Sequence, residues 1–80
     1  MKLTYDPRYN IAYIRLAEKS AEVETLQISD ELNIDIAPDG HVYGIELLNA
    51  NEQLRAEDGG LLVVQNDAKG EKTEIPLAAA

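Results

Sequence analysis

Residues 32–48 read LNIDIAPDGHVYGIELL and hold the clearest fold signal in the chain. In Leu32–Ala37 the apolar residues Leu32, Ile34 and Ile36 alternate with the residues between them, a pattern typical of a strand with one buried and one solvated face. Pro38-Asp39-Gly40 predicts a tight turn, because proline suits its first corner and glycine accepts positive φ. His41–Leu48 should therefore return antiparallel, and Gly44 within it predicts a bulge or a close backbone approach.

Three stretches before residue 32 also alternate apolar and polar residues, as half-buried strands do. A turn at Asp6-Pro7 separates the first two. Leu26 and Ile28 are expected to point into the core. The predicted strands are Leu3–Tyr5, Ile11–Ala17 and Glu22–Ile28.

The residues after 48 predict one helix and a last pair of strands. Asn49 is expected to cap a helix over Ala50–Glu57, with Glu52 completing a variant of the capping box. Glycines 59 and 60 should end it. The continuous apolar run Leu61–Gln65 indicates a buried strand, and the last strand, Glu71–Ile75, is restricted to an edge by the proline that follows it.

Together these elements predict an α+β fold in a single domain, residues 1–80. We expect an antiparallel β-meander of about five strands, a short helix after the last meander strand, and a C-terminal β-hairpin. A chain of 80 residues buries a modest core and has no cysteine for a cross-link, so a homodimer is expected.

The net charge is −8, from 15 acidic and 7 basic residues. The basic residues are scattered and form no stripe, which argues against binding to nucleic acid. A basic protein partner suits this charge, but acidic residues that only maintain solubility explain it more simply. The N-terminus does not resemble a signal peptide, and the longest aliphatic run, Leu61–Val64, is too short to span a bilayer. We expect a cytoplasmic protein without membrane contact.

No residue is assigned a catalytic, cofactor-binding or metal-binding role. His41, the sole histidine, is expected to be exposed beside the turn, with no nucleophile to activate. Asp35 reads as part of a solvated face and Asp39 as a turn residue, since no ordered calcium loop is present. The carboxylates at positions 22, 24 and 46 are expected on the wet side of the sheet rather than as an acid–base pair.

Four tyrosines supply all the aromatic side chains of the chain. Tyr13 is expected on the face opposite Ile14, where it would contribute to an exposed patch suited to a protein contact. The alternative is that the tyrosines cover the rims of a small core. The others are Tyr5, Tyr9 and Tyr43.

Three segments are similar to the YuzE-like family of small bacterial proteins of unknown function. They are MKLTYDP at residues 1–7, AYIRL at 12–16 and DGHVYGIELLNA at 39–50. The resemblance covers residues 1–56 and implies a compact α+β domain with no assigned activity. It also implies an antitoxin-like role, since family members often lie beside small toxin-like genes. Residues 57–80 depart from the family pattern as a C-terminal extension.

Two functions follow from these observations. The first is a non-enzymatic protein that acts through protein–protein contacts and neutralises a basic partner in an antitoxin-like manner. The alternative is a small enzyme or ligand-binding protein whose site the sequence does not reveal. A concave pocket with clustered polar groups of shifted pKa would favour the alternative.

Overall fold

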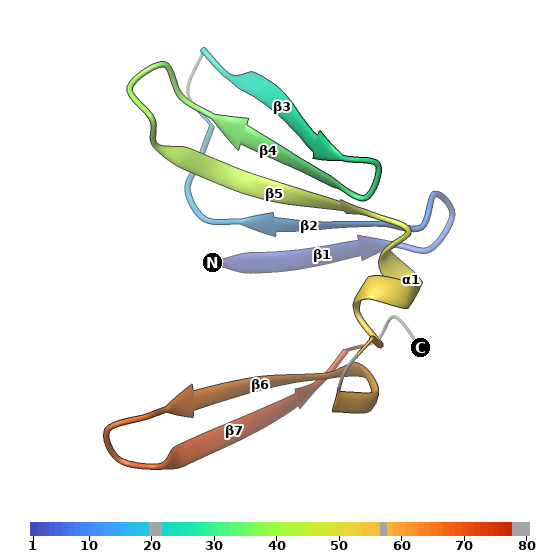
Figure 1. Ribbon diagram of the computed structural model, residues 1–80, viewed down its shortest axis with the longest axis vertical. Coiled ribbons are helices and arrows are strands. Elements are labelled where there is room, and N and C mark those ends of the chain that lie inside the picture. Colours follow the sequence, from blue (N-terminus) through green and yellow to red (C-terminus); the bar gives the residue numbers. More distant parts are fainter. Residues whose placement is uncertain (20–21, 57, 78–80) are drawn as a thin grey trace.

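The computed structural model describes residues 1–19, 22–56 and 58–77. An antiparallel sheet of five strands forms the larger part, and a two-stranded hairpin lies below it in Figure 1. The expected α+β class is confirmed. The strands are β1 (Lys2–Asp6), β2 (Ile11–Arg15), β3 (Glu24–Ser29), β4 (Leu32–Ile36), β5 (Val42–Leu48), β6 (Leu61–Asn66) and β7 (Glu71–Pro76).

The order of the strands across the large sheet is β1-β2-β5-β4-β3. Two hairpin-linked units therefore meet: β1 and β2 form one, and β3, β4 and β5 form the other. They join where β5 pairs with β2, from Ile11 opposite Leu48 to Arg15 opposite Gly44. The chain enters the second unit at its far edge, so β5 becomes the central strand and β1 and β3 the two edges.

The turn between β4 and β5 forms where the sequence predicts it. Gly40 adopts a φ of 97° and donates its N–H to the carbonyl of Ala37, while the Ala37 N–H bonds to the carbonyl of His41. Asp39 accepts a hydrogen bond from the backbone N–H of His41 at 3.1 Å. The pairing of β4 with β5 shifts its register between Asp35, which lies opposite Gly44, and Ile36, which lies opposite Val42. The sequence predicted such an irregularity at Gly44.

Helix α1 (Ala50–Gln53) is shorter than predicted and is capped differently. Asn49 occupies the N-cap position in a left-handed conformation, with φ 54°, and its side chain makes no capping bond. Its Nδ2 instead donates to Glu52 at 2.9 Å. The capping acceptor comes from the β1–β2 turn: Oδ1 of Asn10 accepts the N–H of Asn51 at 2.8 Å. Sequence reasoning missed this contact because 41 residues separate its partners.

The C-terminal hairpin, β6 and β7, is joined to the sheet through α1 and a short 3-10 turn, η1 (Asp58–Gly60). Pro76 lies opposite Leu61, at the end of an edge strand as expected. The radius of gyration is 14.1 Å, against about 12 Å for a compact chain of this length. The separation of sheet and hairpin in Figure 1 accounts for this extended shape.

The buried core is much smaller than the sequence suggests. Among the described residues, the buried apolar side chains are those of Ala12, Ala37 and Ala50, and no large side chain is fully buried. Leu26 and Ile28, expected in the core, are 37% and 57% exposed, because β3 is an edge strand without a covering layer. The predicted burial of β6 is also wrong, since its residues are half-buried or exposed.

Candidate functional site

The two faces of the large sheet differ sharply in chemistry, because paired residues on neighbouring strands share a face. One face, named the polar face, carries two rows that cross all five strands, besides a shorter row of Asp6, Ile11 and Leu48. The first row is Lys2, Arg15, Gly44, Asp35 and Thr25, and the second row is Thr4, Tyr13, Glu46, Asn33 and Gln27. The other, named the apolar face, also carries two. The first row is Leu3, Ile14, Ile45, Ile34 and Leu26, and the second row is Tyr5, Ala12, Leu47, Leu32 and Ser29.

A hydrogen-bonded cluster centred on Asp35 occupies the polar face. The carboxylate accepts bonds from Thr25 Oγ1 at 2.6 Å and Tyr13 OH at 2.8 Å, and pairs with Lys19 Nζ at 2.9 Å. The Lys19 ammonium also lies 4.8 Å from the centre of the Tyr13 ring. Asp35 is only 8% exposed, so its predicted place on a solvated face is wrong.

Gly44 leaves the space that Tyr13 needs to reach Asp35. The ring of Tyr13 crosses β5 directly over Gly44 to reach Asp35 on β4. A Cβ built on Gly44 would overlap the tyrosine hydroxyl and lie 2.7 Å from its Cε1. The close backbone approach that the sequence predicted is therefore present. The exposed patch expected around Tyr13 is not, because its hydroxyl bonds to Asp35 and its ring packs on the sheet.

The protonation states of the cluster suit a structural role. Burial alone would raise the pKa of Asp35, but bonds from Thr25, Lys19 and Tyr13 together hold it below its usual value. The bond to Asp35 raises the pKa of Lys19. Burial and the adjacent carboxylate raise the pKa of Tyr13. Each group is thus fixed further in its ordinary charge state, the reverse of what a proton-transfer site requires.

The apolar face is the most unusual surface of the molecule. Its central row crosses all five strands without a charged residue, yet none of its large side chains is fully buried. A sheet normally buries such a face against a second layer. Helix α1 is a single turn and does not supply that layer. The described residues therefore leave an open apolar surface.

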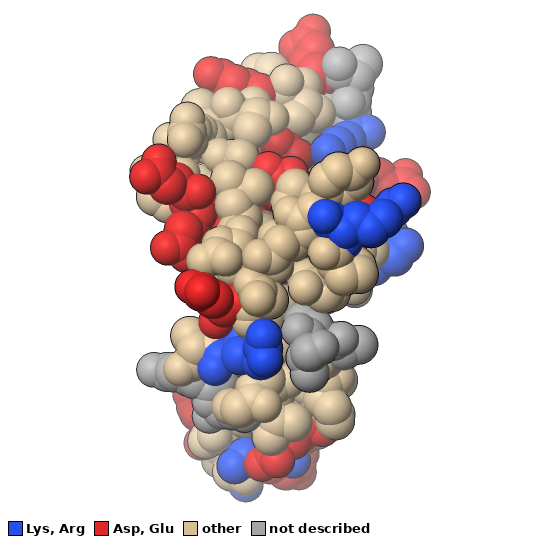
Figure 2. Space-filling model, turned by 90° about the vertical axis from the view of Figure 1, so that its right-hand side faces the viewer, with Lys and Arg blue, Asp and Glu red and all other residues tan. Residues whose placement is uncertain are grey.

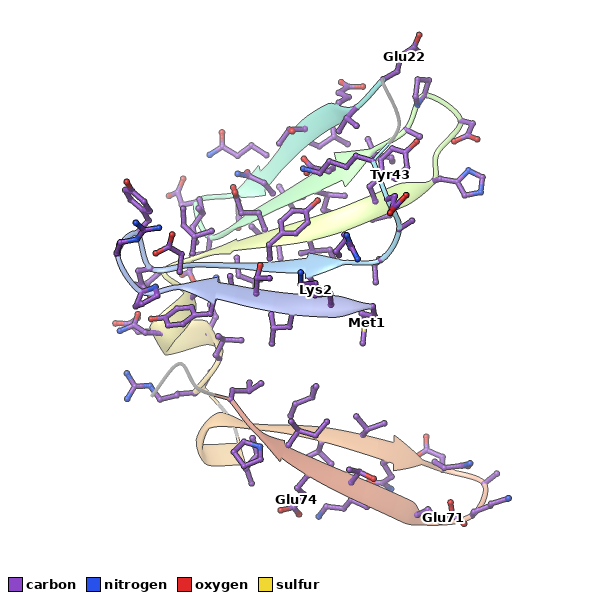
Figure 3. The ribbon with its side chains drawn as sticks, turned by 180° about the vertical axis from the view of Figure 1, so that it is seen from behind. Met1, Lys2, Glu22, Tyr43, Glu71 and Glu74 are labelled. Atoms are coloured by element: carbon purple, nitrogen blue, oxygen red, sulfur yellow. The ribbon has the colours of Figure 1, made fainter. Side chains whose placement is uncertain are left out.

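The hairpin faces one end of this surface across a groove. Leu62 and Ile75, paired between β6 and β7, point toward Leu3 on β1, and Leu54 and Leu77 close the sides. Two overlapping hollows of about 390 and 470 Å³ remain between them. Figure 3 shows Met1 on the hairpin side of β1, and Glu74 on the side of the hairpin away from the sheet. The apolar row of the hairpin thus faces inward.

The edge strand β3 offers a second surface, of different chemistry. All six of its residues are exposed, and β4 is its single neighbour in the sheet. Glu24 begins the strand, and Asp30 and Glu31 follow its end. Figure 2 shows several acidic side chains gathered along the left margin of that view. An exposed edge with acidic ends suits a basic segment in extended conformation.

The remaining candidates from the sequence lie apart. His41 is exposed, as expected, and its Nδ1 lies 2.8 Å from Asp39. Glu46 lies on the polar face and accepts a bond from Asn33 at 2.9 Å, whereas Glu24 lies opposite Ile36 at a corner of the other face. The described residues contain no group of three metal-ligating side chains.

Sequence reasoning missed Lys19 and Thr25 as partners of Asp35. Neither residue stands in a motif: Lys19 lies in the polar connection between two predicted strands, and Thr25 lies within the predicted strand Glu22–Ile28. The one sequence feature that pointed to this cluster was Gly44, because a glycine inside a strand indicates a bulge or a close approach to its backbone. That signal could identify the crossing but not the residue responsible.

Comparison with known proteins places the chain in a family without assigned activity. The family described as "Protein of unknown function (DUF2283)" matches residues 2–51, which include β1–β5 and the start of α1. No curated protein and no solved structure matches significantly. Within the described ranges, no helix has the length and apolar character needed to cross a membrane. With more than half of its length matched, the chain belongs to the DUF2283 family.

Proposed function

We propose that this protein acts through protein–protein contacts, without catalysis. The observation that carries the proposal is the open apolar face, a charge-free row crossing five strands that the described residues face only at the hairpin end. Contiguous apolar surface of this kind is typical of interaction sites. The Asp35 cluster, whose groups have shifted pKa values, lies on the polar face, whereas the hairpin groove is lined mainly by apolar side chains, so the groove does not hold the clustered polar groups that would favour an enzyme.

The finer form of the proposal is a YuzE-like, antitoxin-like protein that neutralises a basic partner. Its support is the net charge of −8 and the exposed edge of β3 with acidic residues at both ends. A basic chain added beside β3 would gain backbone hydrogen bonds from the edge and attraction from Glu24, Asp30 and Glu31. The cytoplasm is the compartment in which we propose it acts.

The test is light scattering coupled to size exclusion, with the protein alone and then mixed with the product of the neighbouring gene. A stoichiometric complex is expected. Glu24→Lys, which reverses one charge at the β3 edge, should weaken it about tenfold, as close charge pairs of about 1–2 kcal/mol imply. Glu71→Lys makes the same charge change on the hairpin and serves as the matched control.

Two results would count against the proposal. Failure of the protein to bind its neighbour would remove the antitoxin-like role. Equal weakening by Glu24→Lys and Glu71→Lys would show that net charge, and not the edge of β3, governs binding.

A further inference from the structure

We infer that the occupant of the apolar face is a second copy of this chain, in a dimer whose interface joins the apolar face to the inward row of the hairpin. This inference rests on the proposed function, because it takes the apolar face to be a contact surface. It adds the identity of the occupant and the residues that meet it.

The exposed area of the chain supports a partner of this size. One chain exposes 5866 Å². A compact protein of 8.8 kDa exposes about 4,800 Å², so about 1,100 Å² more than expected is in contact with water. A stable interface of standard size buries about 800 Å² on each partner. The excess is therefore enough for one dimer interface.

Charge selects a second copy over a basic partner for this face. In a two-fold dimer the same patch meets itself, so the patch must be self-complementary. An apolar row is complementary to another apolar row. A basic partner would require carboxylates within the patch, and the two rows of the apolar face contain none. Glu24 lies at a corner of this face, at the edge of the two apolar rows and not within them.

The position of the hairpin explains why one chain cannot cover its own face. The groove that the hairpin forms is lined on the sheet side by Met1, by Leu3 and Tyr5 of β1 and by Ile14 of β2. The other end of the central row, at Ile34 and Leu26, lies beyond the groove. Val64, on the inward row of the hairpin, remains 53% exposed. A second copy would cover both leftover regions.

Two pairs of adjacent residues supply matched variants. Leu26 and Gln27 are neighbours on β3 and point to opposite faces of the sheet. Val64 and Gln65 are neighbours on β6 and point to opposite faces of the hairpin. Leu26→Glu and Val64→Glu place a charge on the proposed interface. Gln27→Glu and Gln65→Glu add the same charge on the other side.

The experiment is sedimentation equilibrium of the full chain and the four variants, with circular dichroism to verify folding. The wild type should have twice the 8.8 kDa of one chain. Leu26→Glu and Val64→Glu should each raise the dissociation constant at least about 100-fold, because an unpaired charge would be buried. Both positions are exposed in the single chain, so these variants should still fold. The glutamine variants should dimerise like the wild type.

A monomeric wild type would overturn the inference. So would a dimer in which Leu26→Glu or Val64→Glu associates as tightly as its glutamine control. These results are distinguishable from failure of the proposed function. A monomer that binds its neighbour through Glu24 would refute the dimer alone, and a dimer that ignores its neighbour would refute the antitoxin-like role alone.

Discussion

At the scale of single residues, the contact between Tyr13 and Gly44 leaves no room for a side chain at position 44. Gly44→Ala should destabilise the protein by about 2 kcal/mol, because the new methyl group overlaps the ring that reaches Asp35. Urea unfolding measures this loss. In the background of Tyr13→Ala the same change should cost at least about 1 kcal/mol less, a coupling typical of residues in contact. Equal costs in both backgrounds would show that β5 rejects alanine for another reason.

Asp35 should make stability depend on acid. Because the folded state lowers the pKa of Asp35, its contribution is fully present above the unfolded value of about 3.9 and is lost as the pH falls through the folded value. Asp35→Asn should therefore cost about 1–3 kcal/mol at pH 7, and the difference from wild type should shrink below about pH 4. Asp67→Asn, at an exposed turn position, is the control and should change little. A difference that stays constant down to pH 2 would contradict this account.

At the scale of elements, the fold of α1 depends on a turn far away in the sequence. Asn10 accepts the Asn51 N–H, donates from Nδ2 to Asn51 Oδ1 at 2.7 Å, and bonds through its carbonyl to the Ala50 N–H. Asn10→Gly preserves the φ of 56° but removes the side chain, and should cost about 1 kcal/mol. Hydrogen exchange at the Asn51 amide should accelerate. Protection unchanged in Asn10→Gly would show that the backbone bond alone holds α1.

Local sequence patterns predicted the strands and the helix. The features that they did not predict depend on contacts between residues far apart in the sequence. The β4–β5 hairpin follows from Pro38-Asp39-Gly40, whose geometry is fixed by its own residues. The capping of α1 could not be predicted, because the Asn10 cap depends on tertiary contact. The surroundings of Asp35 were missed for the same reason. The exposure of Leu26 was missed because alternation identifies the apolar face of a strand but not whether another layer covers it.

At the scale of the whole molecule, the net charge of −8 should give the two kinds of contact opposite responses to salt. Two copies repel each other while their apolar faces attract, so raising sodium chloride from about 0.05 to 0.5 M should tighten the dimer several-fold. A complex with a basic partner should weaken over the same range. Sedimentation at both salt concentrations measures each effect. A dimer that dissociates in salt would indicate an interface of ion pairs instead of apolar rows.

The crossing of Tyr13 over Gly44 also favours one alignment of β5 against β2 in the folded sheet. An alternating strand can slide by two residues against its neighbour and still keep its apolar side chains on the same face. Such a slide of β5 would bring Val42 or Glu46 to the place that Gly44 occupies, and neither leaves room for the ring. The register of β5 is therefore set in part by the missing side chain of Gly44. Shifted registers that would keep the hydrophobic pattern are disfavoured by the ring of Tyr13.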